Sequence, residues 1–290
     1  MKNILIALTC FLASLSPAFA QLRLPQASPR AQVTQTIGLT DVTVAYHTPG
    51  VKGREVWGKM VPFGQVWRSG ANEATLITFS DSVKINGHSL QAGTYSLFTL
   101  PETKDQWLVI FNTDTTLWGT DGYKPEKDAL RVPVRPDSSA TLLESLQYSF
   151  TNIKTTSATL QLAWEKLVIP INIEVEVFEK ALSNIQEDLS KAKNDDWTIF
   201  AQAAHYLIQN NTRHELALEW INKSLRIKEN FYNSWLKAQL LAQKDEYEEA
   251  VNLAKKAMKL GQNDTKNYSL LSQEMERSLN EWKVKMHYEN

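Results

Sequence analysis

The chain has 290 residues, a length that favours two domains over one. Hydrophobic residues make up 43% and charged residues 22%, so most of the chain has enough apolar side chains to bury a core. Lysine and arginine number 31 against 32 aspartates and glutamates, which gives a formal net charge of −1. This balance argues against a nucleic-acid-binding surface, which needs a basic excess to neutralise phosphates.

The first 20 residues have the pattern of a secretory signal peptide. Lys2 provides a positive start, an apolar run extends from Ile4 to Leu15, and Ala18-Phe19-Ala20 is a small-x-small cleavage site. The run is too short to span a bilayer. We therefore expect cleavage near Ala20, export to the periplasm or secretion, and no membrane span.

The only cysteine, Cys10, lies inside this apolar run. After cleavage the mature chain would hold no cysteine and therefore no disulfide. An exported protein without disulfides suits the bacterial periplasm better than the class of small secreted domains that disulfides stabilise. Lipid attachment at Cys10 is the alternative, although the residues before it match a lipoprotein signal poorly.

From about residue 27 to residue 178 the pattern indicates strands. Short runs alternate apolar and polar residues, and turn signals such as Asn86-Gly87 and Ala92-Gly93 separate them. Asn-Gly between two apolar runs predicts a hairpin, because a type I′ turn needs positive φ at both positions. The predicted strand segments are residues 33–38, 41–48, 74–80, 83–90, 94–100, 106–112, 129–134, 146–150, 158–164 and 170–178. Many short strands with frequent turns predict an antiparallel β-sandwich over residues 28–178.

After Phe178 the apolar residues recur every three or four positions, which predicts helices. The predicted helices cover residues 179–194, 196–211, 214–228, 231–244, 247–261 and 265–283. Short polar segments separate them, and we expect Asp195 and Asp264 to cap the helices that follow. The sequence therefore predicts an all-α domain over residues 180–290.

The helical half also repeats at an offset of 33 residues. The segment "HELALEWINKSLRI" aligns with "YEEAVNLAKKAMKL", so that Ala217 matches Ala250 and Ser224 matches Ala257. Residues 195–285 resemble tetratricopeptide repeats, whose unit is about 34 residues. The resemblance implies a concave helical surface that holds a protein or peptide partner. A stack of helical hairpins that only packs against the β domain is the alternative.

A long connection, "GREVWGKMVPFGQVWRSGANE", precedes the third predicted strand. Glycines and a proline interrupt any helix there, at Gly53, Gly58, Pro62, Gly64 and Gly70. Its apolar residues demand burial, namely Val56, Trp57, Met60, Val61, Phe63, Val66 and Trp67. A loop of this length inside a compact domain is usually functional or disordered, and the need for burial argues for order.

This connection and its flanks carry a family resemblance. The motif "WRSGANEAT" from Trp67 to Thr75, together with "WLVIFN", Trp118-Gly119 and "DALRV", resembles the bacterial family called Domain of Unknown Function 2911. The resemblance covers about residues 28–178. It implies a β domain exported by bacteria of the Bacteroidetes type. It implies no activity, so it assigns no catalytic residue.

The same motif supplies a candidate ligand site. Arg68 offers a planar fork to a carboxylate or phosphate, and Asn72 offers an amide to another amide or a hydroxyl. Indole rings provide flat apolar faces for a sugar ring or a peptide side chain. The predicted ligand-binding residues are Trp57, Trp67, Arg68, Asn72, Glu73 and Trp118. The alternative is structural: Arg68 pairs with Glu73 or with loop carbonyls, and Asn72 occupies a left-handed turn.

Signals for catalysis are weak. The chain has no G-x-S-x-G elbow, no phosphate-binding glycine loop and no close pair of histidines. Glu55, Glu73 and Asp128 are candidate carboxylates for hydrolysis, and Glu73 and Asp128 are the candidate acid or base. We expect no metal and no cofactor.

Three functions follow from these observations. The first is an exported, non-enzymatic binding or adaptor protein, with a small ligand, glycan or peptide on the β domain and a protein partner on the helices. The second is a periplasmic hydrolase that uses a carboxylate near the "WRSGANEAT" loop. The third is a purely structural role without a ligand.

Overall fold

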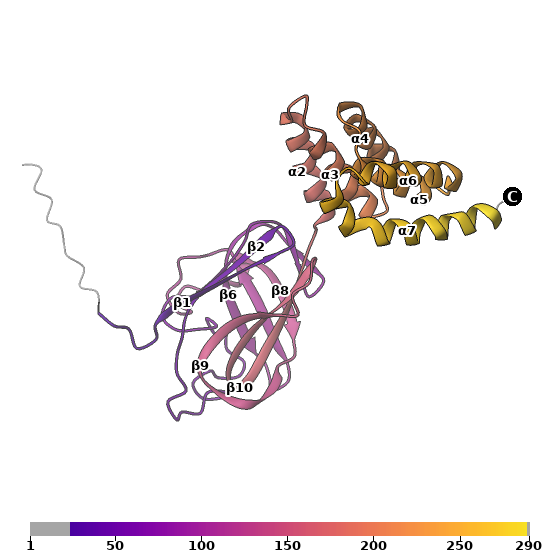
Figure 1. Ribbon diagram of the computed structural model, residues 1–290. Coiled ribbons are helices and arrows are strands. Elements are labelled where there is room, and N and C mark those ends of the chain that lie inside the picture. Colours follow the sequence, from indigo (N-terminus) through magenta and orange to yellow (C-terminus); the bar gives the residue numbers. More distant parts are fainter. Residues whose placement is uncertain (1–23, 289–290) are drawn as a thin grey trace, which may run out of the picture. The chain divides into compact units, whose positions relative to one another are not determined.

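A computed structural model describes residues 24–288, which form two compact units (Figure 1). The first unit ends at Val177 and the second begins at Phe178. The predicted signal peptide, its cleavage site and Cys10 lie outside the described residues. Among residues 24–288, no helix has the combination of length and apolar character needed to cross a membrane.

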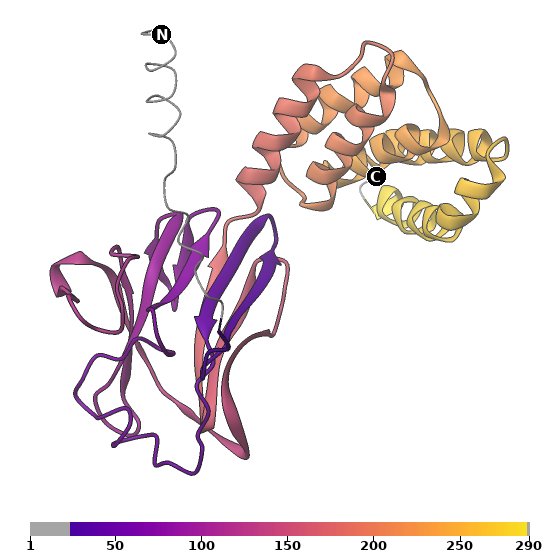
Figure 2. The same ribbon diagram turned by 90° about the vertical axis from the view of Figure 1, so that its left-hand side faces the viewer.

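The first unit, the β unit, consists of two antiparallel sheets. One sheet has the strand order β1-β2-β3-β6-β7-β8, and the other has the order β5-β4-β10-β9. Figure 2 shows these strands from a second direction. The elements are β1 (Arg30–Ile37), β2 (Thr40–His47), β3 (Thr75–Phe79), β4 (Val83–Ile85), β5 (His88–Leu90), β6 (Gly93–Pro101), β7 (Trp107–Asn112), the 3-10 helix η1 (Pro125–Lys127), β8 (Asp128–Val134), β9 (Asp137–Thr151) and β10 (Ser157–Val175).

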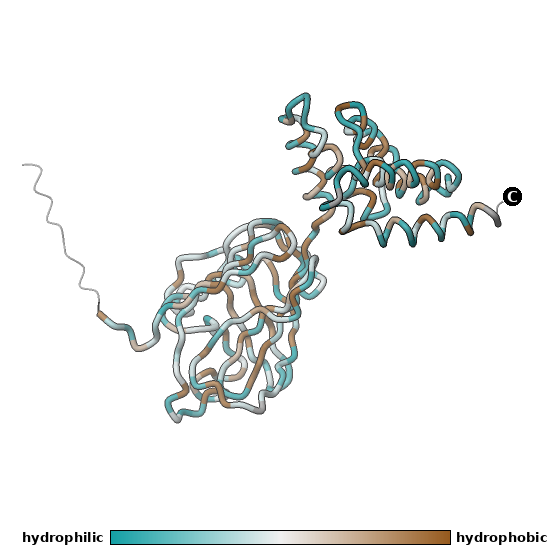
Figure 3. The backbone as a smooth tube through the Cα atoms, in the orientation of Figure 1, coloured by the Kyte–Doolittle hydropathy of each residue, from teal (hydrophilic) through white to brown (hydrophobic). Residues whose placement is uncertain are grey.

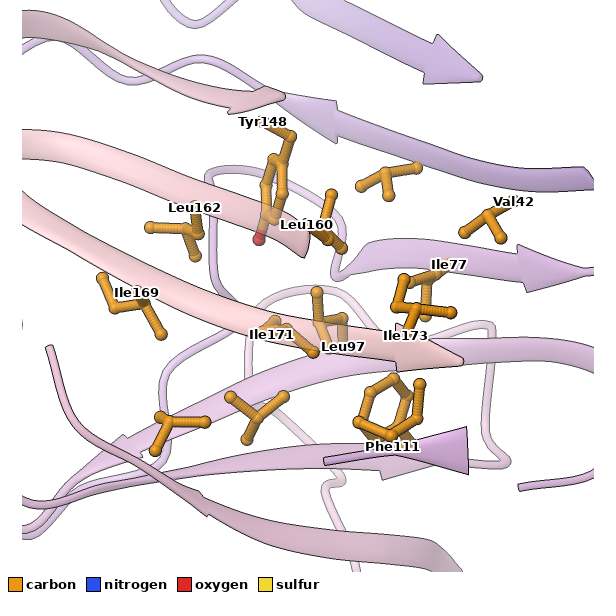
Figure 4. Packing of buried hydrophobic residues seen from close by; sticks show 14 of the residues in the cluster. Val42, Ile77, Leu97, Phe111, Tyr148, Leu160, Leu162, Ile169, Ile171 and Ile173 are labelled. Carbon is orange, nitrogen blue, oxygen red and sulfur yellow. The ribbon is translucent and has the colours of Figure 1, made fainter. Parts of the chain in front are cut away.

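The alternation of side chains explains why the two sheets face each other. In β10, Ile171, Ile173 and Val175 are buried, whereas Asn172 and Glu174 between them are exposed. The buried faces of the sheets share one core, shown in Figure 4. It contains Ile77, Leu97 and Phe111 from the larger sheet and Leu160, Ile171 and Ile173 from the smaller one. The predicted antiparallel sandwich is therefore confirmed.

The closing strand differs from its prediction. Residues 158–164 and 170–178 were expected as two strands, but β10 is continuous from Ser157 to Val175. It pairs first with β9 and then, near its end, with β4. The pairing with β9 shifts register on both sides of Glu165, whose φ is 55°. This irregularity has the character of a β-bulge, which inserts a residue and breaks the alternation without ending the strand.

The predicted hairpin at Asn86-Gly87 is present between β4 and β5. The two residues have φ angles of 47° and 83°, as a type I′ turn requires. The side chain of Asn86 also accepts a hydrogen bond from the backbone of Asn172 at 2.9 Å, which ties the turn to β10.

The second unit, the helical unit, is an array of six helices. They are α2 (Phe178–Lys191), α3 (Trp197–Gln209), α4 (His214–Ile227), α5 (Phe231–Gln243), α6 (Tyr247–Gly261) and α7 (Thr265–Tyr288). Helix α5 begins 34 residues after α3, and α6 begins 33 residues after α4. Figure 3 shows hydrophobic stretches, in brown, along these helices and within the strands of the β unit. The predicted succession of a β domain and a helical array is confirmed.

The N-caps of two helices can be compared with the cap residues predicted from the sequence. The cap of α3 is Asp196, not Asp195, because the Asp196 side chain accepts from the backbone N–H groups of Thr198 and Ile199. The prediction was therefore one residue early. At the start of α7, the Asp264 carboxylate accepts from the backbone N–H of Asn267 at 3.4 Å, as expected of a cap.

Candidate functional site

The long connection between β2 and β3 is held against strand β6 by backbone hydrogen bonds. Trp67 and Thr99 exchange two of them, with N···O distances of 2.8 and 2.9 Å. The Gly64 N–H donates to the carbonyl of Pro101 at 2.7 Å. The connection therefore continues the pairing with β6 beyond the start of β3, and its backbone groups find partners there as buried groups must.

Ser69 is the buried centre of this connection. It has a φ of 55° and no exposed surface, and its hydroxyl lies 3.3 Å from that of Thr99. Its carbonyl oxygen accepts from the hydroxyl of Thr75 at 3.0 Å and from that of Tyr148 at 2.8 Å. Burial raises the pKa of Tyr148, so its hydroxyl stays protonated and remains a donor. These contacts join the connection, the start of β3 and strand β9 at one carbonyl.

Two of the predicted site residues, Trp57 and Trp67, lie in a cluster of four indoles. The centroid of Trp57 is 5.0 Å from that of Trp107 and 5.7 Å from that of Trp164. Trp67 stacks on Trp164 at 5.8 Å, with an angle of 19° between the rings. Both are half-buried and pack against the core of the sandwich. Their rings thus pack against other indoles and against the core of the sandwich.

The other predicted residues meet where two loops run side by side. Glu73 and Trp118 form an antiparallel bridge, with hydrogen bonds from the Ala74 N–H to the Leu117 carbonyl and from the Gly119 N–H to the Asn72 carbonyl, both 3.0 Å. Side chains of directly paired residues lie on the same face. We call this region, residues 68–73 and 117–121, the corner.

Glu73 has a histidine partner that the sequence did not indicate. The Nε2 atom of His47 lies 3.0 Å from the Glu73 carboxylate, and its Nδ1 atom lies 2.9 Å from the carbonyl oxygen of Ser28. The Asn72 amide nitrogen is 3.0 Å from the same Nδ1. Asn72 has a φ of 58°, the left-handed turn that one alternative expected. Glu73 therefore pairs with His47 and not with Arg68.

Arg68 is half-buried at the corner, and its Nε atom lacks a hydrogen-bond partner within residues 24–288. Its Nε atom is fully shielded from solvent, and its Nη1 atom lies 3.5 Å from the position that a Cβ on Gly119 would take. Burial lowers the pKa of Arg68, and the nearby charge of Asp121 opposes that shift. An arginine so placed has donors to offer to a ligand.

Asp128, the second candidate catalytic carboxylate, belongs to a different network. It accepts from the Asn112 amide and the Tyr123 hydroxyl, both at 2.7 Å, and from the Arg131 Nε at 2.6 Å. Burial and the neighbouring Asp128 raise the pKa of Tyr123 to about 12. A carboxylate with both oxygens engaged would have to break these bonds to move a proton. Asp128 thus ties β7, β8 and the loop before η1 together.

The segment that contains the corner also identifies the family of the chain. A family model with the description "Protein of unknown function (DUF2911)" matches residues 28–173. The chain belongs to this family. The match confirms the predicted resemblance, and the DUF2911 segment contains both loops of the corner. No curated protein and no solved structure matches the chain.

The helical unit lies outside the DUF2911 segment and has a hollow of about 760 Å³ lined mainly by α3, α5 and α7, with Tyr247 of α6. We call it the groove. Its lining residues are His205, Ile208, Gln209, Asn211, Tyr232, Trp235, Leu236, Gln239, Ala242, Gln243, Asp245, Tyr247, Leu271, Glu274, Trp282 and Lys285. Sequence reasoning named none of these as ligand-binding. The signal available was the one-turn spacing of Gln239 and Gln243, which places two amides on one face of α5.

Polar side chains in the groove are linked across its helices. The Tyr232 hydroxyl lies 3.0 Å from the Nδ1 atom of His205, and the Gln239 amide donates to the Glu274 carboxylate at 3.1 Å. The Gln243 amide donates to the carbonyl of Ile208 at 2.8 Å. Within the described residues, the amide oxygens of both glutamines have no hydrogen-bond donor. The groove therefore holds acceptors that its own side chains leave unused.

Proposed function

We propose that this DUF2911 protein is a non-enzymatic binding protein, exported to the periplasm or secreted after cleavage near Ala20. Its helical unit, folded as tetratricopeptide-like hairpins, holds an extended segment of a partner protein in the groove. Its β unit binds a small ligand at the corner. The observation that carries the proposal is the groove of about 760 Å³, lined by helices α3, α5, α6 and α7 and by two amide oxygens that have no donor among the described residues.

A peptide backbone matches the polar groups of the groove. Each residue of an extended chain presents one N–H and one C=O, and a glutamine amide pairs with both. Gln239 and Gln243 each have an amide oxygen without a donor, so a backbone N–H that reaches either oxygen after a side-chain adjustment satisfies an acceptor that is now buried alone. Trp235 and Trp282, stacked at a centroid distance of 5.3 Å, are buried and form the apolar floor of the groove beside these amides.

The charge of the groove favours a partner segment with a basic side chain. Burial lowers the pKa of His205, which keeps this imidazole neutral at neutral pH. Glu274 accepts a hydrogen bond from the uncharged amide of Gln239, and no cation of the described residues pairs with it. A lysine or arginine of the partner would therefore find an unpaired carboxylate on α7.

Peptide selection on the mature full chain tests this function. A phage-displayed peptide library is panned against the protein, and the affinity of the selected peptides is measured by fluorescence anisotropy. The double variant Gln239→Leu, Gln243→Leu keeps side-chain volume and removes both amides, so we expect at least a tenfold weaker affinity. The matched control is Gln273→Leu, which alters an exposed glutamine on α7 and should leave affinity unchanged.

Two results would contradict the proposal. One is that no peptide is enriched over the unselected library. The other is that enriched peptides bind the double variant as tightly as the wild type. In either case the helical unit is a scaffold and not a peptide receptor.

A periplasmic hydrolase is the second candidate, favoured by the contact between His47 and Glu73. An imidazole beside a partly exposed carboxylate is a common arrangement for proton transfer. Hydrolysis with a bell-shaped pH profile that Glu73→Gln abolishes would support it, and activity unchanged in that variant would remove Glu73 from the mechanism. A purely structural role predicts instead that corner substitutions change only stability.

A further inference from the structure

We infer that the corner is a platform for a neutral oligosaccharide. The indole of Trp118 stacks on one pyranose ring, while the Arg68 guanidinium and the carboxylates of Glu73 and Asp121 hold its hydroxyls. This inference rests on the small-ligand role proposed for the β unit, and it does not depend on the groove.

Trp118 is exceptional among the indoles of the chain. All nine tryptophans lie within residues 24–288, and the other eight are buried or half-buried, whereas Trp118 is 60% exposed. An indole left in water forgoes the free energy that its burial gives elsewhere. A flat apolar face with a polar surround matches the apolar C–H face of a pyranose ring. The exposed indole of Trp118 therefore suits a ligand with a flat apolar face, such as a pyranose ring.

The backbone holds Trp118 in place before any ligand binds. Its bridge to Glu73 is reinforced by the Gly119 N–H, which donates to the Asn72 carbonyl at 3.0 Å. The Trp118 carbonyl accepts from the Asp121 N–H at 3.3 Å in the turn that follows. Gly119 has a φ of 65°, a conformation that glycine adopts without strain. A platform fixed in this way loses little conformational entropy on binding.

The polar groups around the platform suit hydroxyls. Arg68 lies against Gly119, the neighbour of Trp118, and its Nε atom has no acceptor among the described residues. Glu73 is 55% exposed in its side chain and lies on the face of Trp118, since the two are bridge partners. Sugar hydroxyls both donate and accept, so a guanidinium and a carboxylate on two sides satisfy neighbouring hydroxyls.

The charge balance disfavours an anionic ligand. Arg68 is opposed by the carboxylate of Asp121, which is close enough to affect the pKa of Arg68, and the Glu73 carboxylate lies in the same corner beside His47. A phosphate or carboxylate at Arg68 would meet the negative charge of Asp121. A neutral sugar has no such cost, which is why we assign the corner to neutral oligosaccharides.

Saturation-transfer NMR on the mature full chain tests the inference. The probes are maltohexaose, cellohexaose, xylohexaose and chitohexaose, with hexagalacturonate and inorganic phosphate as anionic comparisons. We expect transfer from the protein to the ring protons of at least one neutral sugar. Trp118→Ala and Arg68→Gln should each weaken that sugar's affinity at least tenfold. Leu142→Ala, which removes another exposed side chain of the β unit (51% exposed), should leave affinity unchanged.

The stability of the variants separates binding from folding. Because Trp118 is exposed, Trp118→Ala should melt within about one degree of the wild type, so a loss of binding cannot come from unfolding. The groove variant Gln239→Leu, Gln243→Leu should bind sugar normally, which distinguishes failure here from failure of peptide binding. The inference is overturned if no neutral sugar shows transfer, if Trp118→Ala binds sugar as well as wild type, or if only the anionic probes bind.

Discussion

The carbonyl oxygen of Ser69 offers a quantitative test of how the β unit holds its long connection. This oxygen accepts from Tyr148 at 2.8 Å and from Thr75 at 3.0 Å, and all three residues are buried. Tyr148→Phe or Thr75→Val removes one donor and leaves the other. A buried hydrogen bond between neutral groups contributes about 1 kcal/mol, so each variant should lower the free energy of unfolding by about 1 kcal/mol.

The double variant should cost more than the sum. With Tyr148→Phe and Thr75→Val together, the Ser69 carbonyl stays buried and loses both donors. Leaving a buried carbonyl without a donor lowers the free energy of unfolding by a further amount of about 1–3 kcal/mol. We therefore expect a total loss of about 3–5 kcal/mol, with a coupling free energy well above the scatter of about 0.5 kcal/mol seen for independent sites.

Hydrogen–deuterium exchange with mass spectrometry measures this effect in the full chain. Peptides of the β unit report its free energy of opening, and peptides of the helical unit serve as an internal control that should not change. The reasoning is refuted if the loss of stability in the double variant equals the sum of the losses in the two single variants. That result would show that water or a loop rearrangement satisfies the carbonyl once the donors are gone.

Three further predictions concern the helical unit. Gly261→Ala should destabilise it by about 1–3 kcal/mol, because the new Cβ would lie 2.2 Å from the Tyr268 ring. Thermal unfolding followed by circular dichroism at 222 nm measures this loss. Adding Tyr268→Ala should remove most of it, because the clash is then gone. Asn230→Ala should cost about 1 kcal/mol in the same assay, since the Asn230 side chain caps α5, whereas Asn230→Asp should keep the cap. Burial lowers the pKa of the half-buried His205, so the unfolded chain takes up its proton at a higher pH than the folded one. The stability that is present above the unfolded pKa is then lost as the pH falls through the folded pKa. His205→Gln should flatten the change in Tm between pH 7.5 and pH 5.

Each of these has a clear contrary result. A more stable Gly261→Ala variant would mean that helix propensity outweighs the Tyr268 contact. An Asn230→Asp variant as unstable as Asn230→Ala would exclude capping as the cause. An equally steep loss of stability on acidification in His205→Gln would assign that loss to other groups.

The fold was largely predictable because local patterns decide it. Alternation in residues such as Ile171 and Ile173 is visible in the sequence and depends only on which face of the strand is buried. The continuity of β10 was not predictable, because the bulge at Glu165 interrupts that alternation. The one-residue error at the α3 cap has a similar origin, since two adjacent aspartates carry the same signal.

The corner was predictable in part. Arg68, Asn72 and Glu73 are close in sequence and stay close in space, whereas the contact of Glu73 with His47 joins segments whose approach depends on how β2 ends. Sequence also cannot say which face of an indole is covered. Trp57 and Trp67 were expected to present open faces, and the structure packs them against Trp107 and Trp164, residues far along the chain.

The placement of β10 at the end of the β unit has a consequence for how the chain folds during synthesis. Asn172 bonds to Asn86 across 86 residues, and the β4 pairs of β10 involve Ile173, Glu174 and Val175. The smaller sheet therefore cannot close until almost the whole β unit has left the ribosome. The helices make mostly local contacts, which form faster than long-range strand pairs. A nascent chain stalled before Ser157 would expose the unpaired edge of β4 to other chains, so premature termination should yield aggregates and not a smaller folded protein.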